Sequence, residues 1–226
     1  MTELVRRLLD LLYPPKCMLC RRILPDSRTS VCPACMDRLP EHDGANPHVQ
    51  YAERCIATFF YEDALREAFH RFKFGGCTFY AEQFGDWMSV TIGDKLAGKF
   101  DCVSWVPVSK KRRRERGYDQ TELLCRRICE NLGVRPVPLL RKTRHTPMQS
   151  GLHDAAARAA NVRGAYEGNP DTDPAGKHIL LIDDIVTTGA TLSECCRVLL
   201  TAGAESVVCA ALATPRSESK RTGELL

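Results

Sequence analysis

The stretch from Ile179 to Thr191 constrains the fold of this chain more than any other. Four apolar residues lead directly into two adjacent acids, Asp183 and Asp184, and a turn of small hydroxyl residues with one glycine follows. After the turn, apolar residues recur at helical spacing. An unbroken apolar run is typical of a strand that is buried on both faces of a parallel sheet. The sequence therefore predicts an α/β fold, with a strand, a loop and a helix in this region.

The predicted loop has the properties of a phosphate site. Open α/β sheets bind ligands at the carboxyl ends of their strands, and a helix N-terminus attracts anions through its unpaired N–H groups and its dipole. Asp183 and Asp184 stand just before this loop, and carboxylates are suitable acceptors for a vicinal diol. A hydrogen bond to a charged group is worth roughly 1.5–3 kcal/mol, so two acids would contribute substantially to sugar-phosphate binding. The candidate phosphate-binding residues are Thr187, Thr188, Gly189, Ala190 and Thr191.

Residues 182–191, Ile-Asp-Asp-Ile-Val-Thr-Thr-Gly-Ala-Thr, resemble the signature of the type I phosphoribosyltransferases. The resemblance implies binding of 5-phosphoribosyl 1-diphosphate together with Mg²⁺. It also implies that Asp183 and Asp184 are the catalytic acids, which hold the ribose 2- and 3-hydroxyls, while the threonine loop holds the 5-phosphate. An ordinary buried strand followed by a capped helix would not require so many matching positions. The lysine of a P-loop does not follow the glycine, which counts against that class of site.

A metal site is predicted closer to the start of the sequence. Two Cys-x-x-Cys pairs are separated by a short polar loop, and each pair can direct two thiolates at one tetrahedral ion. The predicted Zn²⁺ ligands are Cys17, Cys20, Cys32 and Cys35. Four protein ligands leave no open position, which indicates a structural ion that contributes on the order of 10–16 kcal/mol to folding. Disulfides or simply buried thiols are the alternatives, and His42 and His48 are interpreted as solvated loop histidines, not as substitute ligands.

Length and charge narrow the possibilities further. A chain of 226 residues can hold one α/β domain and a smaller one. The linker-like composition of residues 40–50 predicts a zinc-binding domain with a short N-terminal helix over residues 1–45 and a phosphoribosyltransferase-like domain over residues 46–226. The formal net charge is only +4, so contact with nucleic acid must depend on local clusters of charge. Residues 4–13 are far shorter than the roughly 20 residues of a membrane span, and we expect a cytoplasmic protein without one.

The densest cluster of charge follows another predicted strand, Cys102–Val108. All residues but one from Lys110 to Arg116 are basic. We expect this segment to be a loop at the carboxyl end of the strand, where it would neutralise a diphosphate or a nucleic-acid backbone. A merely solvated run of charge is the alternative. The candidate ligand contacts in this segment are Lys110, Lys111, Arg112 and Arg116.

The remaining elements are predicted from periodicity. Strands are expected over residues 55–61 and 134–140, and helices over residues 63–72 and 120–132. Most of the aromatic residues lie between residues 59 and 87, and we interpret them as core side chains, not as a platform for stacked bases. Lys73 is a suspected ligand contact. Residues 141–166 lack an apolar period and are interpreted as a lid, on which His145 and His153 are the candidates for a general base.

These elements resemble, in their order along the chain, the ComF family of competence-associated proteins, which have a zinc head and a phosphoribosyltransferase domain. The matching elements are the four cysteines, Val106-Pro107 with the basic run and Arg116–Gln120, residues 146–152 with Arg158 and Asn161-Val162, and the acidic loop. Two positions differ from the expected pattern. Asp119 stands where asparagine is usual, and Ser109 stands where histidine is often found.

The family resemblance implies work on single-stranded DNA during natural transformation, beside a helicase-type partner. One hypothesis is therefore an enzyme, a phosphoribosyltransferase whose acceptor is unknown. The alternative is a non-catalytic, ligand-gated module that binds nucleic acid or regulates, and that keeps the phosphoribosyl diphosphate site. A third hypothesis, a purely structural zinc-ribbon adaptor, leaves the acidic loop without a purpose.

Overall fold

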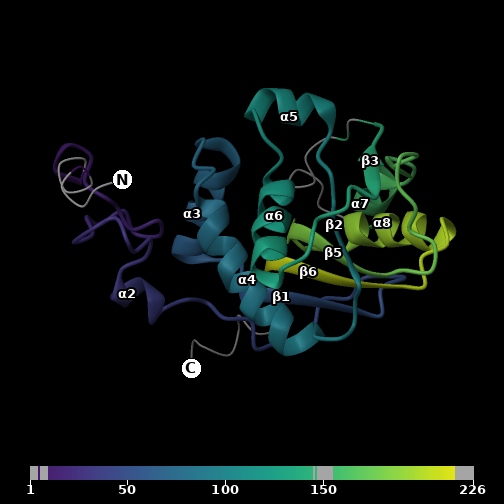
Figure 1. The fold of residues 1–226 in the computed structure, drawn as a ribbon, viewed down its shortest axis with the longest axis horizontal. Coiled ribbons are helices and arrows are strands. Elements are labelled where there is room, and N and C mark those ends of the chain that lie inside the picture. Colours follow the sequence, from purple (N-terminus) through teal and green to yellow (C-terminus); the bar gives the residue numbers. More distant parts are fainter. Residues whose placement is uncertain (1–4, 6–9, 145, 147–154, 217–226) are drawn as a thin grey trace.

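The computed structural model describes residues 5, 10–144, 146 and 155–216. At its centre is a four-stranded sheet in the order β1–β6–β5–β2, in which all neighbouring strands are parallel (Figure 1). A parallel sheet between layers of helices is the architecture that the sequence predicts. The strands are β1 (Arg54–Phe60), β2 (Cys102–Trp105), β5 (His178–Ile185) and β6 (Ser206–Thr214).

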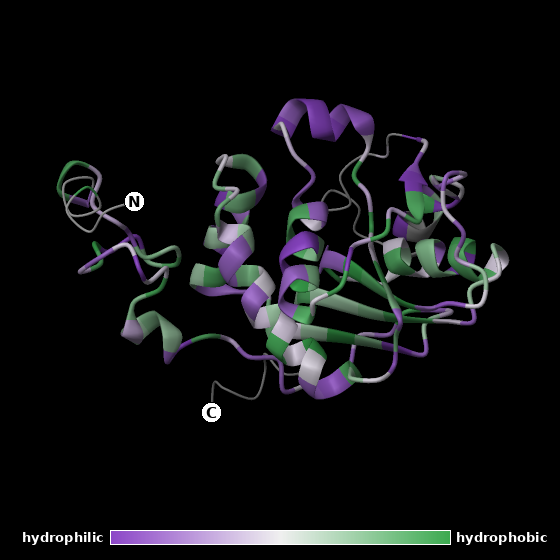
Figure 2. Ribbon diagram, in the orientation of Figure 1, coloured by the Kyte–Doolittle hydropathy of each residue, from purple (hydrophilic) through white to green (hydrophobic). Residues whose placement is uncertain are grey.

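The two central strands are buried on both faces, which explains their apolar runs. In β5, Leu180 and Ile182 belong to the apolar cluster on one face of the sheet, and Ile179 and Leu181 belong to the cluster on the other. Every residue of β6 is buried. Burial of one such aliphatic side chain stabilises the fold by about 1.5–3 kcal/mol, so the central strands anchor both layers. Figure 2 shows the hydrophobic colouring along these strands.

Helices cover both faces of the sheet. On one face, α4 (Tyr80–Leu96) and α6 (Gln120–Leu132) contact the strands, and α3 (Asp63–Phe74) packs into the same cluster. Most of the aromatic residues between 59 and 87 lie in this cluster, in agreement with their interpretation as core. On the other face, α8 (Ala190–Thr201) contacts β6, and α7 (Ala155–Val162) packs against α8. A small antiparallel hairpin, β3 (Leu140–Lys142) with β4 (Tyr166–Gly168), also contacts this layer.

Two predicted elements are wrong. The basic segment is not a loop but a helix, α5 (Lys110–Arg116), which projects from the body of the molecule (Figure 1). Residues 134–140 are not a strand, because Pro136 and Pro138 lack the N–H groups that a strand donates. Only an isolated bridge joins Pro136 to Val103 before β3 begins.

The cysteine-rich head contains the short helix α2 (Pro33–Met36) and leads into a segment along the edge of β1. There, Phe60 N–H donates to the Pro40 carbonyl at 2.6 Å, and His42 N–H donates to the Thr58 carbonyl at 3.0 Å. The prediction of a solvated His42 is wrong, because its ring packs on Phe60 and only 7% of the residue is exposed. His48 is exposed as predicted. The division of the chain at residues 45 and 46 stays a prediction.

Several predictions fall outside the described residues. These are most of the N-terminal helix and much of the predicted lid, including His145 and His153. In the part of the chain that the structure describes, no helix combines the length and apolar character needed to cross a membrane.

Candidate functional site

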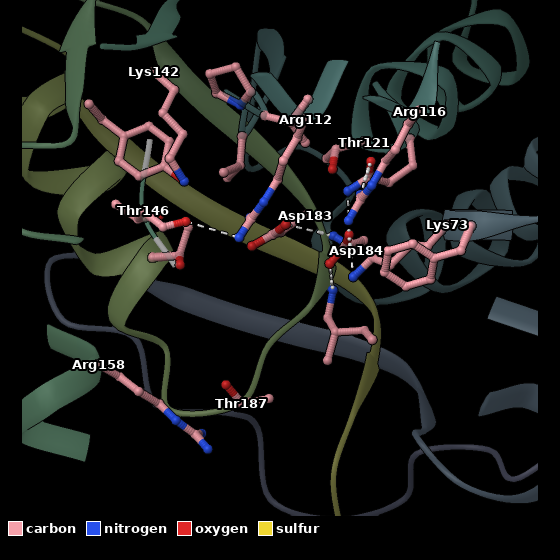
Figure 3. A pocket seen from close by; sticks show the side chains of 18 of the residues that line it. Lys73, Arg112, Arg116, Thr121, Lys142, Thr146, Arg158, Asp183, Asp184 and Thr187 are labelled. Atoms are coloured by element: carbon pink, nitrogen blue, oxygen red, sulfur yellow. Dashed lines mark hydrogen bonds and ion pairs between the residues drawn. The ribbon is translucent and has the colours of Figure 1, made fainter. Parts of the chain in front are cut away.

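The two adjacent acids stand at the carboxyl end of β5. Asp183 and Asp184 are 8% and 7% exposed. Because successive side chains of a strand point to opposite faces, the two carboxylates meet different partners. They border one cavity of about 470 Å³, into which α3, α5, α6, β3 and the threonine loop also contribute side chains (Figure 3).

Asp184 is held as an anion. Its Oδ2 lies 2.9 Å from Lys73 Nζ and accepts a hydrogen bond from Gln120 Nε2 at 2.8 Å, and its Oδ1 accepts from Ile185 N–H at 2.6 Å (Figure 3). Burial acts to raise the pKa of Asp184, but the Lys73 ammonium and these hydrogen bonds outweigh it and hold the pKa below its ordinary value. Lys73, suspected from the sequence, is therefore a direct partner of the acid pair.

Asp183 has the opposite tendency. Burial, and then the neighbouring charge of Asp184, raise the pKa of Asp183 well above its ordinary value. Close by, burial and the Arg112 guanidinium lower the pKa of Lys142 to about 8. Lys142 Nζ donates to Tyr166 Oη at 2.9 Å and lies 4.7 Å from the centre of the same ring. The pair of acids therefore favours one ionised and one protonated carboxyl group.

The threonine loop between β5 and α8 has a conformation that its glycine allows. Gly189 has φ +71°, and a Cβ added there would collide with the His48 carbonyl oxygen. Thr187 and Thr191 line the cavity, whereas Thr188 is exposed and Ala190 begins α8. Arg158 of α7 also lines the cavity, and Figure 3 shows it on the same side as Thr187. A cation beside a loop at a helix N-terminus favours an anionic ligand.

Helix α5 divides its charges between two faces. Arg112 and Arg116, four residues apart, face the acids, and Lys110 and Lys111 are exposed. Arg116 Nη1 donates to Gln120 Oε1 at 2.8 Å, and Arg112 Nη2 donates to the Thr146 carbonyl at 3.1 Å. Of the four predicted contacts in this segment, the structure brings Arg112 and Arg116 to the cavity. Lys111 lines a second cavity, to which both arginines also contribute.

The aspartate at position 119, where the family pattern has asparagine, has a structural reason. This side chain caps the N-terminus of α6, where Oδ1 accepts from the N–H groups of Thr121 and Glu122 at 3.0 and 3.1 Å. Its Oδ2 accepts from Val108 N–H at 2.9 Å. The carboxylate therefore satisfies backbone donors between β2 and α6. Ser109, the other position that differs from the pattern, caps α5 by accepting from Arg112 N–H.

Sequence reasoning missed some residues of the cavity. Gln120, Lys142 and Tyr166 contact the acids or their neighbours, but each precedes or follows a stretch without a clear apolar period. Gln120 had a signal, because it belongs to the motif Arg116–Gln120 that carries the family resemblance. For Lys142 and Tyr166 the only signal was their place at the two ends of the predicted lid.

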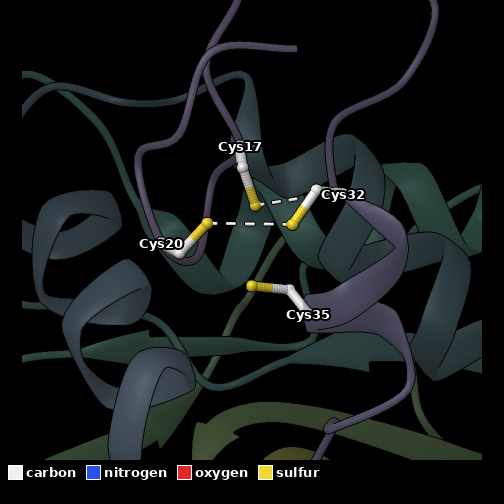
Figure 4. A group of neighbouring side chains, drawn as sticks. All are labelled: Cys17, Cys20, Cys32 and Cys35. Carbon is white, nitrogen blue, oxygen red and sulfur yellow. Dashed lines mark hydrogen bonds between the residues drawn. The ribbon is translucent and has the colours of Figure 1, made fainter.

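The four predicted metal ligands converge (Figure 4). The Sγ atoms of Cys17, Cys20, Cys32 and Cys35 all lie within 4.8 Å of one another. Cys20 Sγ and Cys32 Sγ are 3.7 Å apart, close to the separation of about 3.8 Å that tetrahedral Zn–S bonds of about 2.3 Å require. All of the cysteines are free thiols, so the disulfide alternative is not supported. The donor set fits a structural zinc ion.

Comparisons with known proteins agree with both parts of the chain. Residues 89–224 match the family model of the phosphoribosyl transferase domain, and residues 8–47 match that of the double zinc ribbon domain. Competence protein ComFC of Bacillus subtilis strain 168 is 28% identical over 211 residues, which cover 87% of this chain and 83% of the relative. Competence protein ComFC of Streptococcus pneumoniae is 31% identical over 67% of this chain and 64% of the relative.

DNA utilization protein YhgH of Escherichia coli K12 is 32% identical over 108 residues. That match covers 47% of this chain and 46% of the relative, so the chain spans about half the length of the YhgH proteins it matches. Among solved structures, glutamine phosphoribosylpyrophosphate amidotransferase from B. subtilis overlaps 58% of this chain and 25% of its own, with 21% identity and a TM-score of 0.40. Overlap at this level carries no information about function. The family models and the observed sheet agree with the predicted fold, a type I phosphoribosyltransferase domain with a four-cysteine zinc ribbon.

Proposed function

Because the chain belongs to the phosphoribosyl transferase domain family, in the ComF group that carries a double zinc ribbon, we propose that its cavity binds 5-phosphoribosyl 1-diphosphate together with Mg²⁺. The role that we propose for it is the uptake and handling of single-stranded DNA, in line with the names of its relatives, "competence protein" and "DNA utilization protein". The protein itself is a phosphoribosyltransferase-domain protein related to ComFC and YhgH.

One observation carries the proposal. A pair of buried carboxylates stands between a threonine loop at a helix N-terminus and two arginines on α5, all around one cavity. A sugar phosphate with a diphosphate at its other end has the complementary order of groups: an anion, a diol and a second anion. In this proposal the 5-phosphate contacts Thr187, Thr191 and Arg158, the diol contacts the acids, and the diphosphate contacts Arg112 and Arg116.

The acids also fit the proposed cation. Carboxylate oxygens are the hard ligands that Mg²⁺ prefers, and Asp183 and Asp184 provide them beside the proposed diphosphate position. When bound, Mg²⁺ would offset the negative charge of the diphosphate. Occupation by a cation and a diol requires both carboxylates as acceptors, so Asp183 must give up its proton on binding. Lys73, which neutralises Asp184 before binding, would then share that carboxylate with the ligand.

Turnover, if the protein is an enzyme, follows from the same placement. The bond between the anomeric carbon and the diphosphate oxygen breaks, and the diphosphate leaves with the electron pair. A bond from the acceptor to that carbon forms, and the acceptor proton passes to a base. Ionised Asp183 and Asp184 would stabilise positive charge on the sugar ring, and Arg112 and Arg116 would stabilise the leaving group. The acceptor is unknown.

The test begins with calorimetric titration of the zinc-loaded protein with phosphoribosyl diphosphate and Mg²⁺. Diphosphate release is then measured with nucleobases and with single-stranded DNA as candidate acceptors. Binding followed by release that one acceptor stimulates would support an enzyme and identify its acceptor class. Absence of binding would contradict the proposal at its first step.

The alternative is a non-catalytic module whose handling of nucleic acid is gated by the ligand, and the two faces of α5 favour it. The outer face exposes Lys110, Arg113 and Arg114, while the inner arginines line the cavity. One helix would then contact a DNA backbone on its outer face and the diphosphate on its inner face. Phosphoribosyl diphosphate that binds without release, and that changes the affinity for single-stranded DNA, would favour this module over the enzyme.

A further inference from the structure

The turn between the first two cysteines packs directly against α3. Met18 and Leu19, between the first two cysteines, are only 1% and 5% exposed and belong to the same apolar cluster as Phe69 and Phe72 of α3. Their two carbonyl oxygens accept hydrogen bonds from Nη2 of Arg71, at 2.6 and 3.1 Å. The backbone that folds around the four sulfurs therefore holds a side chain of α3.

Arg71 lies in the last turn of α3, which also forms part of the cavity wall. Two residues later, Lys73 Nζ lies 2.9 Å from Asp184 Oδ2. Phe74 lines the cavity, and the carbonyl of Phe72, which lies between Arg71 and Lys73, accepts a hydrogen bond from Tyr118 Oη. One helical turn thus connects the cysteine turn at one end with the acid pair at the other.

The guanidinium of Arg71 has few hydrogen-bond acceptors besides the cysteine turn in the part of the chain that the structure describes. The side-chain nitrogen Nε of Arg71 is buried and has no hydrogen-bond partner among the described residues. The carbonyls of Met18 and Leu19 are the acceptors that the structure shows for this side chain. Unfolding of the cysteine turn would remove both acceptors of Arg71 and the packing of Met18 and Leu19 in the same cluster as α3. The last turn of α3 would then no longer be held from that side.

We propose that Arg71 is a positioning residue, through which the zinc-held turn places Lys73 and Phe74 in the ligand cavity. Zinc fixes the carbonyls of Met18 and Leu19, these fix Arg71, and the last turn of α3 then sets Lys73 against Asp184. Zinc occupancy and ligand affinity are consequently linked, and by thermodynamic reciprocity the ligand must strengthen zinc retention by the same factor. The linkage to phosphoribosyl diphosphate rests on the proposed function, whereas the coupling of Arg71 to Lys73 does not.

The first arm of the test needs no ligand. Unfolding equilibria of the zinc-loaded protein are measured for the wild type, Arg71→Ala, Lys73→Met and the double variant. We expect the effect of Lys73→Met on the unfolding constant to shrink on the order of fivefold once Arg71 is absent, because the lysine is then no longer held against the acid. Additive effects would overturn the proposal. Arg66→Ala, an exposed arginine of the same helix, is the matched control and should add to Lys73→Met.

The second arm measures zinc release to a chromogenic chelator, with and without phosphoribosyl diphosphate and Mg²⁺. In the wild type the ligand should lower the released fraction, equivalent to a tightening of zinc binding on the order of tenfold. Arg71→Ala should bind zinc but lose this protection, and Arg66→Ala should keep it. The variant Asp183→Asn with Asp184→Asn should show none, which excludes a direct effect of the ligand on zinc.

These outcomes distinguish the positioning role of Arg71 from the proposed binding of phosphoribosyl diphosphate. Failure of the wild type to bind phosphoribosyl diphosphate in calorimetry would contradict the proposed function, and the first arm would still decide the role of Arg71. Binding with equal protection in the wild type and Arg71→Ala would contradict the positioning role while leaving the proposed function intact.

Discussion

Asp183 and Asp184 are neighbours in sequence but lie in opposite surroundings. Asp184 faces Lys73 and Gln120 and stays ionised, whereas Asp183 is buried beside that negative charge and favours its protonated form. The alternation of side chains along β5 separates them, because one points toward the α3 and α6 layer and the other toward the β3 and β4 hairpin. Two chemically identical residues thus have different roles before any ligand is bound.

Replacement of both acids by asparagine should abolish binding of phosphoribosyl diphosphate while zinc content stays unchanged. Asparagine keeps the size of each side chain but removes the charges that the cation and the ribose diol require. Calorimetry measures the first effect, and metal analysis of the same preparation measures the second. Retained binding in the double variant would show that the ribose site lies elsewhere.

Asp183→Asn alone should stabilise the protein, and more so at higher pH. The folded pKa of Asp183 is raised above the unfolded value of about 3.9, so between the two pKa values the native state holds a proton that the unfolded state has lost. Stability of the wild type therefore falls as pH rises through this interval, and the asparagine variant lacks that loss. The amide oxygen of the new asparagine would still accept from Asp184 N–H, as the Asp183 carboxyl does at 2.8 Å in the wild type.

Denaturant unfolding of both proteins at about pH 5, 7 and 8.5 measures the difference. The advantage of the variant should grow with pH and level off above the folded pKa of Asp183. A difference that is constant, or that shrinks with rising pH, would contradict the raised pKa. The same variant should bind the ligand more weakly, since the asparagine cannot supply a carboxylate.

At the scale of elements, α5 shows why a local pattern misled the prediction. Its sequence, Lys-Lys-Arg-Arg-Arg-Glu-Arg, contains no apolar residue, so hydrophobic periodicity gives no helical signal. The terminal signals were nevertheless present, with Ser109 as the N-cap and Gly117, at φ +82°, as the C-cap. The helix matters for the proposed function because its spacing brings Arg112 and Arg116 to one face, which a loop would not ensure.

Gly189→Ala should destabilise the protein and weaken ligand binding. A residue other than glycine at φ +71° costs on the order of 1–3 kcal/mol, and the new Cβ would also collide with the His48 carbonyl oxygen. Gly176→Ala is the matched control, because Gly176 has φ +66° but no atom within 4 Å of an added Cβ. Thermal unfolding should show the larger loss for Gly189→Ala. Equal losses would mean that the approach of residue 48 to the loop is not constrained.

At the scale of the whole molecule, the sequence predicted the groups of residues that lie within one short stretch. It missed the residues that the fold brings together from distant stretches. The zinc ligands and the acidic loop are each contained in a short stretch, so their chemistry can be recognised without a fold. The other walls of the cavity come from α3, α6 and the β3–β4 hairpin, and only the packing of the sheet brings Lys73, Gln120 and Lys142 to the acids. β6 was not predicted at all, although it lies between β1 and β5 and completes the core.

Charge is also organised at this scale, because a net charge of +4 is too small to attract DNA by itself. The outer face of α5 concentrates exposed cations at the edge of the molecule, where Figure 2 shows a strongly hydrophilic helix. The variant Lys110→Gln, Arg113→Gln, Arg114→Gln should therefore weaken binding of single-stranded DNA and leave phosphoribosyl diphosphate affinity unchanged, because these side chains line neither cavity beside the acids. Each lost phosphate contact lowers the slope of log K against log salt by about 0.7, so three should lower it by about 2.

Fluorescence anisotropy with a labelled oligonucleotide over a series of salt concentrations measures this slope. The matched control is Arg112→Gln with Arg116→Gln, on the inner face of the same helix, which should weaken ligand binding first. An unchanged salt slope in the triple variant would place the DNA-binding surface elsewhere. A loss of ligand affinity in that variant would show that the two faces of α5 do not act separately, because the exposed cations would then contribute to the cavity.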